Sequence, residues 1–511
     1  MGGTNTEDPP ESATPATGLM RGRPDRPTLL LLLGTLVGGC LIFWAVHEAL
    51  ADDAYITLTY ARTLGLHGEW GLVPGYPSNT ATSPLNVLLL GLLVAVVREP
   101  LVALGVLYVL TCLVTAYGLR GLGRELGLGL RLAVVGTPLL LANPLLASTV
   151  GLETTMVVAA MVHLAWAAVR RDAVRFGLVA GVLMWLRLDT VVIVGAAFVL
   201  TPALWRRWYV AAGLSAAVLL PWLLFSWVVL GSAIPDTLVI KQEGGWGDFV
   251  TDPYHRYAVR YPLAALAVAV TAAVGLVSAL SWPSWRLSSR AGSSVVPALP
   301  GAALAYFLTI AALGVPPFFW YYGPTAAALT ICAAIGVAHL LAGVQVTLRR
   351  TGAAVSAATG VVLVVSWVHD LTEWAPLRAM PIHGNWGYPD EYARIGTELG
   401  KRVGDAAVQS PGEVGGLIYH CECVLSDRFS ERAQILDDIE ERTQSSWLMR
   451  LNYLFLDSEE IEPMDAQLRL RWERGPDRSR RGWDLHGFEG TRRERGHLRL
   501  KPFDGSRLVS R

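Results

Sequence analysis

Long apolar stretches separated by short polar turns occupy most of the chain. Runs of roughly 15 to 25 mainly apolar residues recur between Pro27 and Asp370, and about 20 such residues make a helix long enough to cross a bilayer. We expect crossings at 28–47, 101–119, 131–147, 152–169, 174–188, 189–204, 209–230, 259–281, 297–313, 323–345 and 353–369. The pattern therefore predicts a mainly α, polytopic bundle of about eleven transmembrane helices spanning 28–370.

The pattern changes after Asp370. Residues 371–511 are rich in Arg, Asp and Glu and contain no membrane-length apolar run, so we expect a soluble domain. Within it "YARIGTEL" indicates a helix, whereas "GEVGGLIYH" and "SWLMRLNYLFLD" contain apolar runs typical of strands. The domain is therefore predicted to be α/β.

Basic residues collect between alternate apolar runs and so predict an orientation. The clusters are Arg21/Arg23/Arg26, Arg120/Arg124/Arg131, Arg170/Arg171/Arg175, Arg206/Arg207, Arg286/Arg290 and Arg349/Arg350. They share one side, the cytoplasmic one, only if the further apolar stretch 84–97 does not cross. We therefore expect an interfacial helix at 84–97, within a first extracytoplasmic loop at 48–100. Eleven crossings then leave a disordered N-terminus (1–27) in the cytoplasm and the domain at 371–511 outside the cell membrane.

Composition narrows the function classes. Of the 511 residues, 52% are hydrophobic and 16% are charged, values that a soluble protein rarely combines. The sequence contains no basic patch interleaved with aromatic residues, so nothing in it indicates nucleic-acid binding. Cys421 and Cys423 could close a disulfide or stay reduced, and a lone Cys-x-Cys pair is poor evidence for zinc. No dense ligand cluster demands a metal, so we expect no required cofactor, although a divalent metal is compatible with the sequence.

Under the predicted topology, the unusual polar residues of the membrane region gather at its outer face. Ionisable residues in such segments are costly and therefore indicate function. The candidates are Asp52, Asp53, Tyr55, Glu153, Arg187, Asp189, Asp236 and Lys241, together with the aromatic residues Trp320 and Tyr321. Segments distant in sequence thus converge on one side, as expected of a ligand site built between helices.

Several of these residues also have a structural interpretation. Glu153 opens a helix, where the helix dipole would stabilise its carboxylate. Arg187 and Asp189 could pair in a tight outer turn, and the aromatic cluster 318–322 is more typical of an interfacial belt than of a sugar platform. Lys241 is harder to explain, because it is the single lysine before residue 371 and its compact charge suits a phosphate.

The adjacent acids Asp52 and Asp53 have the strongest claim to function. Successive side chains on a helix point about 100° apart, so the two carboxylates cannot share one task. If "DAYITLTYAR" is helical, Asp52 is a natural N-cap for it, which leaves Asp53 free to face a cavity. We therefore predict that one acid is catalytic or binds substrate, and we favour Asp53.

In these stretches the sequence resembles the GT-C superfamily of polytopic glycosyltransferases, especially the arabinofuranosyltransferases that finish cell-wall arabinan. The matching segments, in family order across about 40–427, are "DDAYITLTYARTL", "TSPLNVLLLGLL", "GLETTM", "RLDT", "GSAIPDTLVIK", "PFFWYYGP" and "GEVGGLIYHCECVLSD". Two positions depart from the family pattern. Where the family has Arg-Pro-Asp-Gly, this chain has Arg187-Leu188-Asp189-Thr190. Where the family has Pro-Asn-Thr, it has Pro235-Asp236-Thr237.

The resemblance implies a helical membrane bundle, juxtamembrane helices in a large first outer loop, an extracytoplasmic C-terminal domain and a catalytic carboxylate in the Asp52/Asp53 pair. Nucleotide sugars are absent outside the cytoplasm, so we expect a polyprenyl-phosphate sugar as donor. The sugar, arabinofuranose or a hexose, would pass with inversion to an extracytoplasmic cell-envelope glycan or another acceptor. Asp53 would act as general base, and Lys241 with Arg187 would hold the phosphate. The alternatives are a transporter or flippase of lipid-linked sugars, or a non-catalytic scaffold for envelope assembly.

Overall fold

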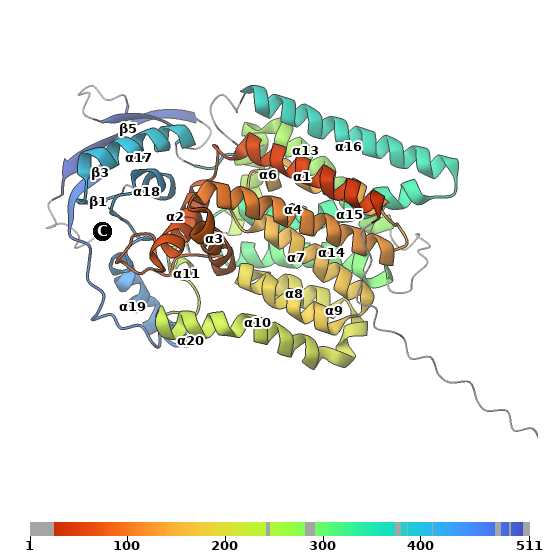
Figure 1. Cartoon of the computed structure of the whole chain (residues 1–511), viewed down its shortest axis with the longest axis horizontal. Helices are drawn as coiled ribbons and strands as arrows, with labels where there is room; N and C mark the ends of the chain where they lie inside the picture. The colour runs from red at the N-terminus through yellow and green to blue at the C-terminus, as the bar shows by residue number, and fades with distance from the viewer. Residues whose placement is uncertain are drawn as a thin grey trace, which may run out of the picture.

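The computed structural model describes residues 25–241, 246–281, 292–373, 380–385, 387–410, 412–475, 482–489 and 492–503. The molecule is elongated, with a bundle of long helices and a smaller domain of helices and strands at one end (Figure 1). The first helix begins at Arg26. Arg26 and Pro27, which were predicted to belong to the disordered N-terminus, are therefore helical. Residues 1–24 of that prediction lie outside the described residues.

Each of the eleven predicted apolar segments contains a helix. These are α1 (Arg26–Val46), α4 (Pro100–Glu125), α5 (Arg131–Leu141) with α6 (Pro144–Ala147), α7 (Thr154–Arg170), α8 (Ala173–Leu186), α9 (Val191–Val199), α10 (Trp208–Val229), α13 (Pro262–Ser281), α14 (Gly292–Ala312), α15 (Gly323–Ala342) and α16 (Val346–Glu373). In the described part of the chain, six helical segments are long and apolar enough to cross a membrane, and they contain α1, α4, α10, α13, α15 and α16. The chain is therefore a multi-pass membrane protein, while the number of crossings stays a prediction.

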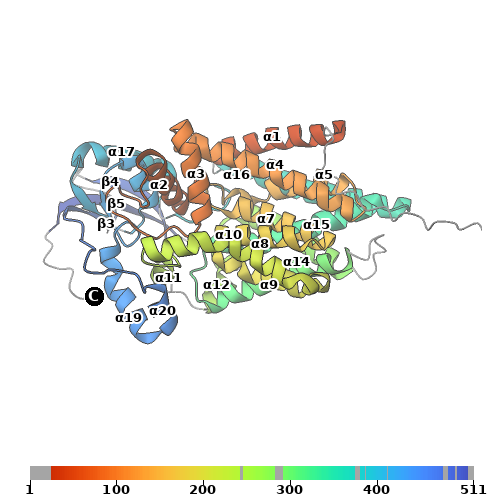
Figure 2. The same cartoon turned by 60° about the horizontal axis from the view of Figure 1, so that its bottom comes forward.

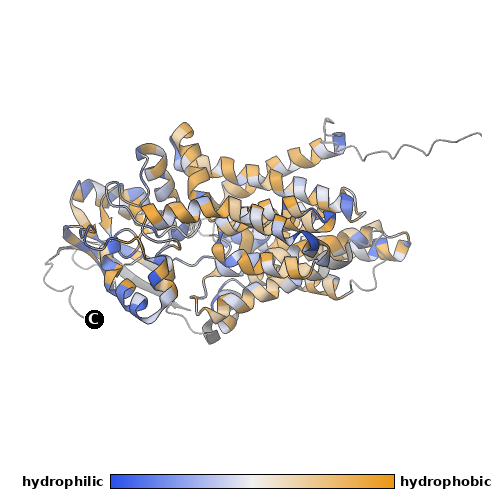
Figure 3. Ribbon diagram, turned by 90° about the horizontal axis from the view of Figure 1, so that it is seen from below, coloured by the Kyte–Doolittle hydropathy of each residue, from blue (hydrophilic) through white to orange (hydrophobic). Residues whose placement is uncertain are grey.

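Hydrophobic residues dominate the long helices of the bundle (Figure 3), and many of them are exposed. On α1, for example, Leu30 and Trp44 are 69% and 71% exposed, which suits a surface covered by lipid. Inside the bundle, small residues bring backbones into contact. A Cβ added to Gly275 of α13 would lie 2.0 Å from the carbonyl oxygen of Leu329 on α15, so only glycine permits this approach.

The turns that carry the predicted basic clusters lie away from the C-terminal domain. The α4–α5 and α15–α16 turns are at the far end of the bundle (Figures 1 and 2), and they carry the clusters that include Arg120 and Arg349. The cluster Arg286/Arg290 lies outside the described residues. This arrangement matches the charge pattern, and the assignment of that end to the cytoplasm remains a prediction.

Two further helices, α2 (Asp52–His67) and α3 (Pro84–Val97), lie between the bundle and the C-terminal domain. They pack closely, because an added Cβ at Gly65 of α2 would lie 2.6 Å from the carbonyl oxygen of Gly91 on α3. Figure 2 shows α3 running crosswise to the long helices. The position of α3 along a membrane interface is still a prediction.

The C-terminal domain contains one five-stranded sheet in the order β2-β1-β3-β5-β4. Its strands are β1 (Ala407–Gln409), β2 (Leu425–Ser426), β3 (Ala466–Arg474), β4 (Trp483–Glu489) and β5 (Arg492–Pro502). β1 pairs in parallel with β2 and β3, whereas β5 is antiparallel to β3 and β4. The helices are α17 (Pro389–Val403), α18 (Gly415–Cys421), α19 (Leu436–Ser445) and α20 (Trp447–Asn452). The mixture of helices and strands is as predicted.

Individual elements of this domain were predicted less well. The helix predicted at "YARIGTEL" lies within α17, but the strand-like stretch "GEVGGLIYH" forms α18, and "SWLMRLNYLFLD" forms α20 and a turn. The strand prediction for both stretches is therefore wrong. An apolar run of this length does not distinguish a buried strand from a short buried helix, and tertiary contacts decide between them.

Asp52 supplies the tertiary contact for α18. Its carboxylate accepts hydrogen bonds from the backbone N–H groups of Gly415 and Gly416, at 3.0 and 2.7 Å, and so satisfies free donors at the start of that helix. The prediction that Asp52 caps its own helix is wrong, because Ala51 occupies that position. An added Cβ at Gly415 would lie 2.0 Å from the carbonyl oxygen of Asp52, so glycine is needed at this junction.

A second junction between the bundle and the C-terminal domain is a buried ion pair. Arg432 donates to both carboxylate oxygens of Asp236, at 2.8 and 2.9 Å, and Asp236 is fully buried. The hydroxyl of Ser232 also donates to Asp236, at 3.1 Å. This bidentate geometry holds the segment that precedes α11 (Thr237–Ile240) against the domain.

We expect Arg432→Leu to lower the free energy of unfolding by about 3–5 kcal/mol, because it leaves the buried Asp236 carboxylate without its cation. Arg428→Leu is the matched control. Arg428 pairs with Asp438 at 2.6 Å, but both side chains are at least 40% exposed, so its loss should change stability by less than about 1 kcal/mol. Unfolding in detergent, followed by intrinsic fluorescence, measures both. Equal stability of the two variants would contradict the importance of this junction.

The Asp52 contact should also produce a pH dependence of stability. Burial raises the pKa of the Asp52 carboxyl from 3.8 to about 6, against the lowering effect of the two glycine N–H donors. The folded state thus binds a proton that the unfolded chain has released, and rising pH lowers the free energy of unfolding between about pH 4 and 6. The stability difference between the wild type and Asp52→Asn, measured by thermal unfolding at closely spaced pH values, should fall through this window and then level off. A difference that does not vary with pH would contradict this assignment.

Candidate active site

Asp53, the neighbour of Asp52, forms an ion pair with a lysine instead of binding α18. Its Oδ2 atom lies 2.8 Å from Nζ of Lys241, and the two side chains are 25% and 12% exposed. Lys241 directly follows the short helix α11. Two residues that are 188 positions apart in sequence therefore form a largely buried ion pair.

A cavity of about 270 Å³ opens beside this pair. Three separate parts of the chain supply its polar wall: Lys241 after α11, Arg187 and Asp189 at the α8–α9 turn, and Tyr321 just before α15. Its remaining wall is mainly apolar, formed by Thr82, Leu188, Ile234, Pro235, Thr237, Leu238, Ile310, Leu313 and Val315. A polar end joined to apolar walls suits a ligand that has a charged group and a hydrocarbon tail.

Carboxylates hold the Arg187 guanidinium in the cavity wall. Glu153, at the start of α7, accepts from it at 2.6 Å, and Asp189 accepts two hydrogen bonds from it, at 3.0 and 2.5 Å. Asp189 also accepts from the Tyr306 hydroxyl at 3.3 Å. Arg187 and Asp189 thus form the pair that was the structural alternative for these residues, and Asp189 lies in a 3₁₀ turn at Leu188–Thr190. Both residues line the cavity as well.

Aromatic rings surround the two cations. Arg187 lies over the ring of Tyr321 at 5.0 Å, and Nζ of Lys241 lies about 6 Å from the ring centres of Phe318, Trp320 and Phe429. Trp320 and Tyr321 are only 7% and 8% exposed. The favoured interpretation of this cluster as an interfacial belt is wrong, because its rings are buried against the charged groups of the site.

A smaller, polar recess of about 20 Å³ is lined by both members of the ion pair. Its lining includes Asp53 and Lys241, the hydroxyl residues Thr57, Tyr60, Thr80 and Thr82, and Phe429 of the C-terminal domain. Thr82 and Lys241 line both spaces. The Asp53–Lys241 pair therefore borders a small hydroxyl-lined recess, and its lysine also borders the larger, mainly apolar cavity.

Five of the predicted site residues line neither space, and two of them, Glu153 and Trp320, still contact the cations of the site. The other three have partners elsewhere. Asp52 binds α18, and Asp236 binds Arg432, as described above. Tyr55 is buried and contacts the rings of Tyr419 and His420, at 5.2 and 5.4 Å between centroids. All three connect the bundle to the C-terminal domain. They therefore help to join the two parts that form the site, but they do not line its cavity.

Four residues of the site and its junctions were not predicted from the sequence: Thr80, Thr82, Arg432 and Phe429. Thr80 and Thr82 belong to the hydroxyl-rich stretch "SNTATS" before α3. That composition is the feature of the sequence from which they could have been predicted. The Thr80 hydroxyl donates to the carbonyl oxygen of Phe429 at 2.8 Å. Nothing local marks Arg432 or Phe429, because their partners are more than 180 residues away in sequence.

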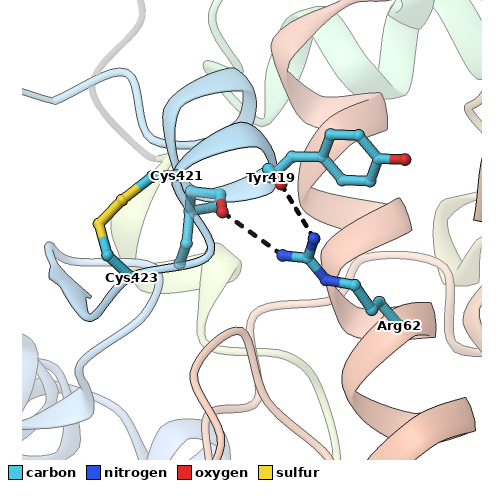
Figure 4. Close-up of a disulfide and its surroundings, with 5 residues drawn as sticks. Arg62, Tyr419, Cys421 and Cys423 are labelled. Atoms are coloured by element: carbon cyan, nitrogen blue, oxygen red, sulfur yellow. Dashed lines mark hydrogen bonds between the residues drawn. A yellow bond between two sulfur atoms is a disulfide. The ribbon is translucent and has the colours of Figure 1, made fainter. Parts of the chain in front are cut away.

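A disulfide between Cys421 and Cys423 lies at the end of α18. Between the two cysteines, Glu422 adopts a left-handed backbone conformation with φ of 53°. Arg62 of α2 donates to the Tyr419 carbonyl oxygen at 2.9 Å and to the Glu422 carboxylate at 3.0 Å (Figure 4). The disulfide thus lies beside a third contact between α2 and the C-terminal domain, in addition to those of Asp52 and Tyr55.

In the described part of the chain, no group of three or more His, Cys, Asp or Glu side chains could hold a metal ion. The cations of the site are Lys241 and Arg187. They face three carboxylates, those of Asp53, Asp189 and Glu153. The expectation about cofactors remains a prediction.

No protein-family model matches the chain, and no curated protein sequence matches it significantly. The structure does resemble solved membrane enzymes. Apo ArnT from Cupriavidus metallidurans superposes with a TM-score of 0.54 at 12% identity, covering 92% of this chain and 97% of ArnT. ArnT bound to undecaprenyl phosphate gives a TM-score of 0.52 with the same identity and coverage.

The apo oligosaccharyltransferase of Archaeoglobus fulgidus gives a TM-score of 0.53 at 13% identity, covering 86% of this chain and 69% of that enzyme. At such low identity, structural similarity establishes the fold but not the substrate. It nevertheless agrees with the ordered segments that the sequence shares with glycosyltransferases. The chain therefore shares the fold of ArnT and of the archaeal oligosaccharyltransferase.

Proposed function

We propose that the protein is a membrane glycosyltransferase that takes its sugar from a polyprenyl-phosphate donor. The observation that carries the proposal is the Asp53–Lys241 pair, which places a carboxylate next to a cation at the boundary between two spaces. A carboxylate can accept the proton of an attacking hydroxyl, and a cation can stabilise a leaving phosphate. Sugar transfer from a lipid phosphate needs both groups.

The larger cavity suits the donor. A lysine ammonium has three N–H donors, and among the described residues Asp53 is its one hydrogen-bond partner, so Lys241 retains capacity for phosphate oxygens. The nitrogens of Arg187 already bind Glu153 and Asp189, and we infer that Arg187 contributes mainly its positive field. The apolar walls would contact the first prenyl units. The undecaprenyl phosphate bound to ArnT, a structure of the same fold, supports a donor of this class.

The small recess suits the acceptor. Phe429 of the C-terminal domain is part of its lining, together with Asp53 and the threonines Thr57, Thr80 and Thr82. Hydroxyl groups and an aromatic ring are typical partners of a sugar. An acceptor hydroxyl that entered here would meet the Asp53 carboxylate, and inversion requires that its oxygen attack the anomeric carbon from the face opposite the phosphate.

In the proposed step, the acceptor oxygen attacks the anomeric carbon while its proton passes to the Asp53 carboxylate. The bond from that carbon to the phosphate oxygen breaks, and its electron pair leaves with the lipid phosphate. The departing phosphate needs no proton donor, so one carboxylate suffices, unlike the pair used by most glycosidases. Lys241 would exchange its contact with Asp53 for the phosphate as the negative charge grows.

The location of the site favours an enzyme over a transporter. Transporter sites lie near the middle of the membrane and between internal repeats. Here the charged groups lie where helices of the bundle meet the C-terminal domain, and that domain contributes Phe429. We further propose an extracytoplasmic cell-envelope glycan as acceptor and arabinofuranose or a hexose as sugar. The ordered resemblance to the arabinofuranosyltransferases supports arabinofuranose as the sugar.

Asp53→Asn should lower the turnover of sugar transfer by about 10² to 10⁴, because an amide cannot accept the proton of the acceptor hydroxyl. Binding of polyprenyl phosphate should persist. Radiolabelled sugar transfer in proteoliposomes measures the first quantity, and equilibrium binding of the lipid phosphate measures the second. Asp172→Asn is the matched control, because Asp172 caps α8 at its N-terminus and asparagine also caps helices well. Normal turnover of the Asp53 variant would exclude the proposed base.

Lys241→Met should instead weaken binding of the donor. Loss of a hydrogen bond to a charged group corresponds to about 1.5–3 kcal/mol, so the KM for the donor should rise by about tenfold to a hundredfold. Lys401→Met, at an exposed position of α17, should leave the KM unchanged. The same assay with a chelator tests the metal prediction, because transfer should persist in EDTA. An unchanged donor KM for the Lys241 variant would argue against phosphate binding at this lysine.

A further inference from the structure

The C-terminal domain carries an unusual exposed apolar surface on α20 and the turn that follows it. We call the side chains of this surface the α20 patch, and they are Trp447, Leu448, Leu451, Leu454 and Phe455, each between 46% and 66% exposed. The opposite side of the segment packs inward, where Tyr453 contacts a small core with Val239 and Ile439. Five large apolar side chains exposed on one short segment of a soluble domain indicate an interaction surface.

The α20 patch adjoins one end of the membrane helix α10 (Figures 1 and 2). The indole N–H of Trp227 on α10 donates to the Leu451 carbonyl oxygen at 2.8 Å, and its ring meets Phe455 edge-on at 5.0 Å. At the same end of α10, Leu224, Phe225, Val228 and Val229 are exposed, in a helix long and apolar enough to cross a membrane. The α20 patch therefore continues the apolar surface that α10 presents to lipid.

We propose that α20 and the following turn insert into the bilayer interface at this end of the bundle, with lipid covering the α20 patch. Amphipathic segments of this kind lie in the membrane plane, with their apolar face buried about 5–10 Å into the boundary between headgroups and acyl chains. Tryptophan is favoured at that depth, and Trp447 is the most exposed residue of the α20 patch. Arg450, exposed on the same helix, would reach the lipid headgroups.

This anchor would act on the segment that leads to Lys241. Asn452 of α20 accepts from the backbone N–H of Ile234 at 2.8 Å and donates to its carbonyl oxygen at 3.3 Å. Ile234 lines the larger cavity, and the Tyr453 hydroxyl donates to Asp236 at 3.3 Å. Lipid contact at α20 would thus keep the C-terminal domain seated against one wall of the cavity.

Nitroxide labels on the full-length protein in lipid nanodiscs test the proposal. The free cysteines Cys40, Cys112 and Cys332 are first replaced by alanine, and the disulfide is kept. Labels are then placed by Leu448→Cys or Leu454→Cys in the α20 patch. Gln444→Cys, on the exposed surface of α19, is the aqueous control, and Leu224→Cys on α10 is the lipid control.

We expect the labels at 448 and 454 to collide with molecular oxygen several-fold more than with a water-soluble nickel chelate, as the label at 224 does. The label at 444 should show the reverse. Strong collision with the nickel chelate at both patch positions would mean that water covers them. Weak collision with both reagents would mean that a protein, such as a second copy of this chain, covers them. Either outcome would overturn the proposal, and the use of two exposed positions keeps the test independent of one poorly folded variant.

Discussion

Successive side chains of an α-helix point about 100° apart, and at the start of α2 this angle separates two neighbouring acids. Asp52 turns to the C-terminal domain and binds the first N–H groups of α18. Asp53 points in another direction and binds Lys241 of the membrane region. The position of the Asp53 carboxylate is therefore fixed from both sides, by the domain through Asp52 and by the bundle through Lys241. The remaining features of the site are arranged around this division.

The cation of the pair depends on a second set of contacts. Lys241 follows a short segment whose Asp236 is held by Arg432 and whose Ile234 is held by Asn452, and both of these partners belong to the C-terminal domain. The carboxylate of Asp53 and the ammonium of Lys241 are thus both positioned by that domain, although both residues belong to the membrane region. The domain is accordingly an integral part of the site, and Phe429 extends it into the recess itself.

The sequence predicted features that depend on local pattern or on charge. Every predicted apolar segment contains a helix, and Asp53, Lys241, Arg187 and Asp189 meet at one site, because buried ionisable groups must find partners. It failed where distant contacts decide the outcome. The stretch that forms α18 resembles a strand until the Asp52 carboxylate meets its first turn, and Phe318–Tyr322 resembles a lipid-facing belt until cations are placed beneath its rings. Arg432 carries no local signal at all, since Asp236 is 196 positions away.

The charges of the site bear on how the proposed reaction could proceed without a metal. Two cations face three carboxylates among the described residues, so an added phosphate meets a site that is already slightly negative. In the proposed step the lipid phosphate gains one negative charge as it leaves, while Asp53 loses one by taking the proton of the acceptor. The total charge in the site is then unchanged, and the protonated Asp53 no longer competes for Lys241. The same ion pair that holds both groups in the resting protein would thus release the lysine to the phosphate when the leaving group needs it.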